Sequence, residues 1–135
     1  MRRAPARRTA AEREARAVVA SRSHGWCELG CGRRATDASH RLARSHGGPW
    51  SADNIIHLCR ADHAGLHANP RAAVAAGLHL RSHQDPAAEP VWMAVAGGRD
   101  LLTESRWVVL AQDGTWSPAE DRPRPDMPWQ VRRGA

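Results

Sequence analysis

The segment from Cys27 to His67 holds most of the side chains in this chain that bind metal ions or transfer protons. All three cysteines and five of the eight histidines of the 135-residue sequence lie within it. Thiolate and imidazole groups at paired spacings are the ligands that zinc and similar ions prefer. Scattered core cysteines and surface histidines would not explain so many paired ligands in one segment. The segment therefore predicts a small fold organised around bound metal.

The cysteine pattern also bears on the compartment. Three cysteines set among histidines argue against a disulfide framework and for a reducing environment. No apolar run approaches the roughly 20 residues that a membrane-spanning helix needs. The arginine-rich N-terminus lacks the apolar stretch of a signal peptide. We expect a cytoplasmic protein with no membrane partner.

The length of the chain allows one domain with a modest core. Residues 118–135 carry four prolines and no apolar periodicity, so we expect them to form a disordered tail. Residues 1–8, rich in Arg, Ala and Pro, also look poorly suited to folding. A core of roughly 100 residues benefits from a structural metal ion.

The positive charge is concentrated at the N-terminus. Residues 1–34 hold nine arginines and three glutamates, which accounts for the whole formal charge of +6. Such an arm suits a phosphate backbone, although a solvated tail is the alternative. All twenty basic residues are arginine, a compositional bias, so the choice of Arg over Lys carries no information about phosphate recognition.

Local patterns predict mixed secondary structure. Thr9 is a good N-cap for a helix through about Ser21, because Glu12 follows three residues later. Residues 37–42 and 55–58 are expected to form two strands joined by a long loop. A helix should begin near residue 60 and end before Pro70.

The C-terminal third predicts a short helix and further strands. We expect a helix over 71–76, ended by Gly77, and strands over 78–81, 91–96 and 106–111. Residues 85–126 carry eight acidic residues and four arginines, so this part is expected to pack against the rest of the protein rather than to bind DNA.

Helical spacing divides the metal ligands into two groups. His63 and His67 are four residues apart and share one helix face, close enough to bind one ion. Cys59 and Asp62 are three residues apart and point to a different side. One helix therefore predicts two metal sites, one of them closed by the earlier cysteines.

The order of these elements resembles the HNH endonucleases, also known as ββα-metal or His-Me finger nucleases. A cysteine knuckle precedes a strand that ends at His40, an Arg- and Gly-rich loop leads to Asn54, and a strand then runs into the helix with His63 and His67. The resemblance covers roughly residues 22–70 and looks closest to small bacteriophage HNH proteins. Three elements typical of those proteins are Gly-Gly-Pro-Trp-Ser (47–51), His-Ala-Asn-Pro (67–70) and Asp-Gly-Thr-Trp (113–116).

The resemblance implies an α+β fold with a zinc-stapled ββα-metal core, an N-terminal helix and a C-terminal β-hairpin extension. The corresponding segments are a basic arm and helix (1–21), the nuclease core (22–70), an extension packing on the core (71–117) and the tail (118–135).

For catalysis, the resemblance implies a general base at His40 and an orienting role for Asn54, acting on the loop or on His40. His63 and His67 would bind a divalent ion, Mg²⁺, Mn²⁺, Ni²⁺ or Zn²⁺. Ser39 occupies the position of a third ligand that is usually His or Asp, and a hydroxyl is a poorer ligand. Asp37, on the same strand face, is a possible substitute. The arginines expected to contact DNA are Arg33, Arg34, Arg41 and Arg44.

The structural zinc site would comprise Cys27, Cys31, Cys59 and Asp62. It departs from the two Cys-x-x-Cys pairs usual in the family, because the first pair has one extra residue and Asp62 stands where a fourth cysteine is expected. Zinc accepts a carboxylate ligand. The alternatives are zinc with His63 as the fourth ligand, and no zinc.

The function implied is metal-dependent hydrolysis of DNA phosphodiester bonds, leaving 5′-phosphate and 3′-hydroxyl ends. A monomer would nick one strand and a homodimer could cut both. The phage-like elements also imply a role in genome packaging beside the terminase large subunit, in the host cytoplasm. The alternative is a zinc-stabilised DNA- or protein-binding module that has lost catalysis, for which Ser39 and Asp62 are the evidence.

Overall fold

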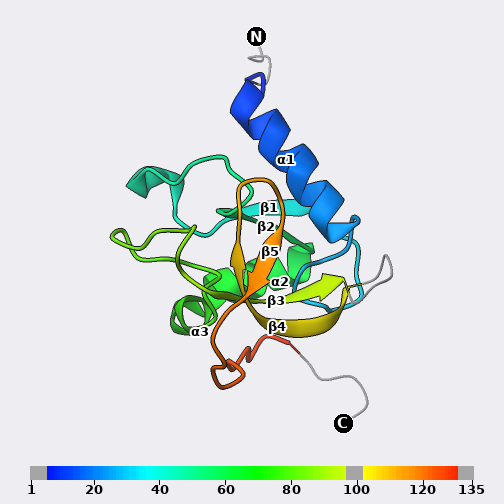
Figure 1. The fold of residues 1–135 in the computed structure, drawn as a ribbon, viewed down its shortest axis with the longest axis vertical. Coiled ribbons are helices and arrows are strands. Elements are labelled where there is room, and N and C mark those ends of the chain that lie inside the picture. The colour runs from blue at the N-terminus through cyan, green and yellow to red at the C-terminus, as the bar shows by residue number, and fades with distance from the viewer. Residues whose placement is uncertain (1–5, 97–101, 131–135) are drawn as a thin grey trace.

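The computed structural model describes residues 6–96 and 102–130. It is an α+β fold with two small antiparallel sheets, β1-β2 and β3-β4-β5 (Figure 1). The elements in chain order are α1 (Ala10–Ser23), β1 (Asp37–His40), a 3-10 turn (Arg44–His46), β2 (Ile55–Leu58), α2 (Arg60–Ala68), α3 (Pro70–Ala75), β3 (Val91–Ala96), β4 (Leu102–Leu110) and β5 (Trp116–Pro118).

Helix α1 begins where its N-cap pattern predicts. The Thr9 hydroxyl accepts a hydrogen bond from the backbone N–H of Glu12 at 3.1 Å. The helix ends at His24, which adopts a left-handed conformation with φ 54°. Its buried side packs Val19 against Ala52 and Ile55, next to β2. The helix runs two residues beyond the expected end, because Ser23 is still buried in its last turn.

The strands β1 and β2 pair antiparallel, with Ser39 opposite Ile56 and His40 opposite Ile55. β1 is shorter than the expected 37–42: its paired residues end at His40, although Arg41 N–H still donates to Asn54 O at 2.8 Å. β2 leads directly into α2 through Cys59, the N-cap of that helix. This continuity fixes the ligands on α2 relative to β1.

The second sheet packs on the same core. One cluster of buried side chains combines residues from the cysteine knuckle, β2, α2, α3, β3 and β4, including Leu29, Leu58, Leu66, Met93 and Val108. β4 begins earlier than expected, and β5 follows the turn at Asp113 and Gly114. Residues 78–81, expected to be a strand, form a loop.

The segment after β5 contacts the core instead of extending as a disordered tail. Met127 is 9% exposed and belongs to the main core cluster, with Trp129 packed against it. Trp129 lies over α2 at Gly65, where an added Cβ would be 2.2 Å from the indole Cγ. The composition of the segment misled the prediction because two apolar side chains suffice to anchor it. Residues 131–135 of the expected tail lie outside the described residues.

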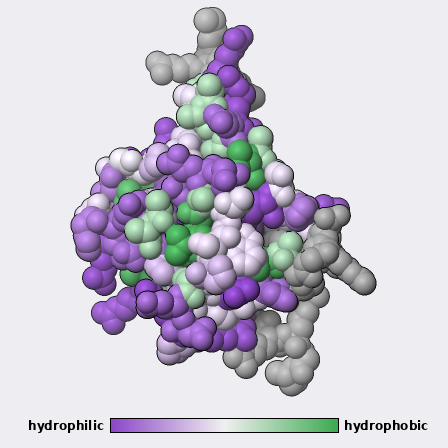
Figure 2. Space-filling model, in the orientation of Figure 1, coloured by the Kyte–Doolittle hydropathy of each residue, from purple (hydrophilic) through white to green (hydrophobic). Residues whose placement is uncertain are grey.

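The surface shown in Figure 2 is largely hydrophilic, with hydrophobic residues in small separate groups. Among the helices in the described parts of the chain, none is long and apolar enough to cross a bilayer.

Candidate metal centres and the pocket at strand β1

Three thiols and one carboxylate converge where the knuckle meets the start of α2. The ligand atoms of Cys27, Cys31, Cys59 and Asp62 all lie within 4.8 Å of one another. The Sγ atoms of Cys31 and Cys59 are 3.6 Å apart, and Cys27 Sγ lies 3.1 Å from Asp62 Oδ2. Tetrahedral zinc with Zn–S bonds of about 2.3 Å would hold two sulfurs about 3.8 Å apart. The cluster therefore fits a bound metal ion.

The turn between Cys27 and Cys31 is one residue longer than a Cys-x-x-Cys turn, and it buries Glu28. Cys27 N–H donates to Arg33 O at 2.9 Å, and Gly30, with φ +72°, closes the turn by donating to Cys27 O. Glu28, inside the knuckle, is 0% exposed. Its carboxylate accepts a hydrogen bond from the backbone N–H of His57 at 2.8 Å, which ties the knuckle to β2.

Arg22 neutralises this buried carboxylate. Its guanidinium forms two 2.8 Å hydrogen bonds to the two oxygens of Glu28. It also donates to the carbonyls of Ala52 and Ile55, each at 2.7 Å. The pair joins α1, the knuckle and β2. Sequence reasoning missed it, because no local spacing marks an ion pair formed between a helix end and a turn.

Burial is the main cause of the pKa shifts of two thiols in the cluster. Burial raises the pKa of the Cys27 thiol, and it raises that of Cys31 to about 11. Burial alone would also raise the pKa of the Asp62 carboxyl, but hydrogen bonds led by those from Cys27 and Gln130 bring it below its ordinary value. Without metal the thiols of Cys27 and Cys31 therefore keep their protons, and binding an ion would release them.

The second oxygen of Asp62 is held by the C-terminal segment. Oδ1 accepts hydrogen bonds from Trp129 Nε1 at 3.0 Å and Gln130 Nε2 at 3.1 Å. Oδ2 is therefore the oxygen that faces the thiols. Sequence reasoning missed both donors, because they lie in the segment expected to be disordered.

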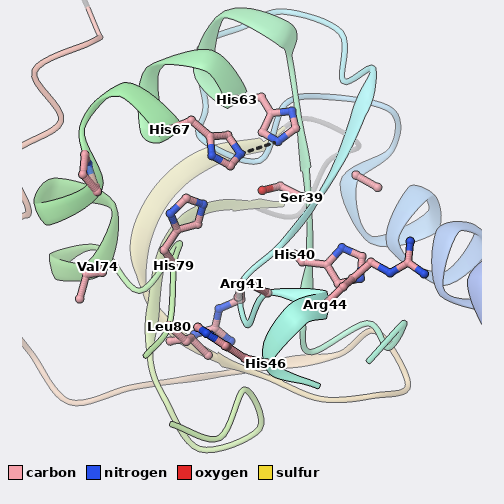
Figure 3. Close-up of a pocket in the computed structure, with 13 residues that line it drawn as sticks. Ser39, His40, Arg41, Arg44, His46, His63, His67, Val74, His79 and Leu80 are labelled. Carbon is pink, nitrogen blue, oxygen red and sulfur yellow. Dashed lines mark hydrogen bonds between the residues drawn. The ribbon is translucent and has the colours of Figure 1, made fainter. Parts of the chain in front are cut away.

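A pocket of about 480 Å³ opens beside β1 (Figure 3). Its polar lining residues include Ser39, His40, Arg44, His46, His63, His67 and His79. These residues come from β1, the following loop, α2 and the loop after α3. The pocket thus joins most of the residues expected to act in catalysis with two histidines, His46 and His79, to which the sequence assigned no role.

Two imidazoles from α2 face one another in this pocket. His63 Nε2 and His67 Nε2 are 3.2 Å apart, close to the separation of two nitrogens on one tetrahedral ion. On its other side, His63 Nδ1 lies 2.8 Å from Asp37 Oδ2. A carboxylate behind a metal-binding histidine fixes the ring orientation and raises its basicity. The two nitrogens lie at hydrogen-bond distance, a spacing that two ligands of one ion would also have.

This arrangement bears on the alternatives for both sites. His63 faces the pocket and Asp62 stands with the three cysteines, so the geometry does not favour His63 as a fourth ligand of the thiol cluster. Ser39 points toward the histidines (Figure 3). Asp37, considered above as a substitute ligand, contacts His63 and supports it from behind.

His40 points to the opposite side of β1 from Ser39, as strand alternation requires (Figure 3). Its ring stands edge-on to Trp50, with centroids 4.5 Å apart. Its Nε2 atom is buried and has no hydrogen-bond partner in residues 6–96 and 102–130. Burial, followed by the charges of Arg44 and Arg16, lowers the pKa of His40. The imidazole is therefore neutral at neutral pH, the form that accepts a proton.

Asn54 holds the loop that follows β1. Its buried side chain accepts a hydrogen bond from Leu42 N–H at 2.8 Å. It donates to the carbonyls of Leu42 and Pro49, both at 3.1 Å. Of the two roles considered for it, the contacts match orientation of the loop. That loop carries Arg44 to the rim of the pocket.

Arg41 does not lie where a DNA contact is possible. Its side chain is 1% exposed, and its guanidinium donates to five backbone carbonyls: those of Asp53, Gly77, Pro86, Glu89 and Pro90. Burial lowers its pKa to about 10. The expectation that Arg41 binds phosphate is wrong, because its guanidinium is buried and already donates to these five carbonyls.

The other three arginines expected to bind DNA are exposed. Arg44 lines the pocket. Arg34 stacks over the ring of Trp26, 4.4 Å from its centroid. Arg33 and Arg34 sit on the knuckle and do not line the pocket. Arg44 is therefore the one of these three that lines the pocket, and its side chain extends beside His40, away from His63 and His67 (Figure 3).

Comparison with protein-family models, with curated proteins and with solved structures finds no match to this chain. The geometry of the named residues therefore carries the functional proposal.

Proposed function

We propose that this protein is a metal-dependent endonuclease with an HNH-type ββα-metal core. The observation that carries the proposal is the pocket at β1: the paired imidazoles of His63 and His67 lie on one side of the strand, and the neutral His40 and the exposed Arg44 lie on the other. A metal ion, a general base and a cation that binds phosphate each accelerate the hydrolysis of a phosphodiester.

Each side chain then has a task. His40 accepts the proton of the attacking water, since its lowered pKa keeps the ring neutral. Arg44 holds a phosphate oxygen through its guanidinium. Asn54 fixes the loop that carries Arg44. A divalent ion on His63 and His67 would neutralise charge on the phosphate and stabilise the leaving 3′ oxygen.

The thiol cluster supports a separate, structural role. Its ligands are largely buried and it joins the knuckle to α2, so an ion there would be closed off from substrate, as structural zinc sites are. Zn²⁺ suits three thiolates and one carboxylate. We propose that this ion stabilises the fold and takes no part in hydrolysis.

DNA is the proposed substrate, with recognition through the backbone. The charge excess lies in residues 1–34, and the exposed Arg33 and Arg34 of that segment are available to phosphates. A role beside the terminase large subunit in phage genome packaging rests on the resemblance alone.

The test is cleavage of supercoiled plasmid by the full-length protein with Mg²⁺, Mn²⁺, Ni²⁺, Zn²⁺ or EDTA. We expect metal-dependent nicking or linearisation that His40→Ala abolishes. The matched control is His83→Ala, an exposed histidine outside the pocket, which should cleave like the wild type.

The second candidate is a zinc-stabilised DNA-binding module without catalysis. The hydroxyl of Ser39 at the position of a metal ligand favours it. Plasmid that stays intact with every ion but is retarded on a gel would decide for the binding module and against the nuclease.

A further inference from the structure

His79 is a third imidazole in the pocket, on the loop after α3. Its ring lies beside that of His67, with centroids 4.9 Å apart and planes tilted by 59°. The rings of His63 and His67 have the same separation, 4.9 Å, and a similar tilt of 54°. The rings of His63 and His79 thus flank the His67 ring at the same separation and at similar tilts (Figure 3).

The backbone around His79 is fixed on both sides. The N–H of His79 and that of Leu78 donate to the same carbonyl at the end of α3, Ala73 O, at 3.2 and 2.9 Å. Leu80 N–H donates to Arg41 O at 2.8 Å. The buried guanidinium of Arg41 also bonds Gly77 O at 2.8 Å. The loop is thus attached to α3 and to the residue that follows β1.

The pocket needs another ligand. Catalytic zinc sites commonly use three protein side chains and keep one position open. His63 and His67 supply two, and the third that the neighbouring strand offers is the hydroxyl of Ser39, which binds metal weakly. His79 lines the same pocket and is half-buried, and its ring lies on the same side of β1 as the rings of His63 and His67.

We propose that His79 is the third protein ligand of the ion held by His63 and His67, and that this all-imidazole set selects a borderline transition metal, Zn²⁺ or Ni²⁺, over Mg²⁺. Imidazole suits the former ions, whereas Mg²⁺ prefers oxygen ligands. The inference rests on the proposed ion site of the nuclease and names its third ligand and its metal class.

Binding requires a local adjustment at His79. In the described residues, the thiol cluster is the one group of three or more such ligands whose donor atoms already lie within 4.8 Å of one another. The His79 ring must therefore turn toward His67 when the ion binds.

The experiment is calorimetric titration of the full-length protein with Ni²⁺, after one equivalent of Zn²⁺ has filled the thiol cluster. His79→Gln keeps a side chain of similar size and removes the ligand, so Ni²⁺ binding should weaken at least about tenfold. The matched control is His46→Gln, which alters another histidine of the same pocket and should leave the affinity unchanged. Mg²⁺ should bind the wild type far more weakly than Ni²⁺.

His79→Asp separates ligation from packing. It restores a metal-binding group, so it should recover part of the Ni²⁺ affinity that His79→Gln loses. Equal affinity in His79→Gln and wild type, or no second Ni²⁺ site in the wild type, would overturn the proposal. Equal loss in His79→Gln and His79→Asp would assign His79 to packing and overturn it too.

Plasmid cleavage is scored separately. If the wild type cleaves plasmid and His79→Gln binds Ni²⁺ as tightly as the wild type, His79 is not a ligand, and the proposed nuclease activity is supported. A His79-dependent Ni²⁺ site in a protein that never cleaves DNA would uphold the ligand and reject the nuclease.

Discussion

Trp129 donates its indole N–H to Asp62 Oδ1 at 3.0 Å, although the two residues are 67 positions apart. The bond holds one carboxylate oxygen and leaves Oδ2 facing Cys27 and Cys59. Outer hydrogen bonds of this kind orient metal ligands and tune their affinity. The C-terminal segment is therefore part of the candidate zinc centre.

Trp129→Phe should weaken zinc binding at the thiol cluster. The substitution keeps an aromatic ring but removes the N–H, so Asp62 loses one of the two donors that orient it. Loss of such a contact typically costs about 10- to 100-fold in affinity. Competition with a chromophoric chelator measures it. Trp92→Phe, on β3, should bind zinc like the wild type, and equal affinity in both variants would contradict the role of Trp129.

Gly65→Ala should also weaken the zinc centre, although alanine favours helices by roughly 1 kcal/mol over glycine. The new methyl would sit 2.2 Å from Trp129 Cγ, so the indole has to move off α2. The exposed neighbour Ala64→Gly gives the opposite change in propensity without that clash. If zinc affinity and thermal midpoint rise in Gly65→Ala, the packing of Trp129 on α2 is not needed.

Removing the structural metal should lower the thermal midpoint, because the small core and the knuckle depend on it. Asp62→Ala should abolish the response to a strong chelator, whereas His63→Ala should keep it. Differential scanning calorimetry with and without chelator tests both. The reverse pattern would make His63 the fourth ligand of the cysteines.

Arg41 and Arg44 should behave differently despite their proximity in sequence. Arg41→Met leaves five carbonyls, three of them buried and two partly buried, without their donor, so the free energy of unfolding should fall by about 3 kcal/mol or more. Arg44→Gln alters an exposed side chain and should leave stability within about 0.5 kcal/mol. Urea denaturation compares them. In plasmid assays Arg44→Gln should lose activity while still folded.

Asn54→Asp should loosen the loop after β1. The change is isosteric, but it replaces a donor to Leu42 O and Pro49 O with an acceptor. The buried carbonyl of Leu42 and the partly buried carbonyl of Pro49 then face an oxygen, which should cost about 2–5 kcal/mol. Urea denaturation measures the loss, and Asn69→Asp, on a half-buried side chain at the end of α2, is the matched substitution. Equal stability of Asn54→Asp and wild type would mean that the loop does not depend on the hydrogen bonds that Asn54 donates.

Local patterns in the sequence were sufficient for several elements. Thr9 and Glu12 set the start of α1, and the spacing of Cys59, Asp62, His63 and His67 divided their side chains between two sides of α2, as observed. These features depend on residues three or four positions apart, where helix geometry leaves few options.

Contacts between distant segments could not be predicted in this way. Arg41 looked like a phosphate ligand because it follows His40 in an arginine-rich loop, yet its partners are carbonyls up to 49 residues away. Trp129 lay in a segment whose proline content suggested disorder. His79 had no partner at a helical spacing, and only the loop bonded to Arg41 brings it to His67.

The sequence by itself determined which ligands exist and how α2 divides them, because side-chain direction follows from helical periodicity. The tertiary structure alone decided which arginine is buried, that Trp129 supports Asp62 and that His79 joins the pocket. Those outcomes depend on how loops and the C-terminal segment pack over a shared core, where burial and backbone hydrogen bonds outweigh local preference.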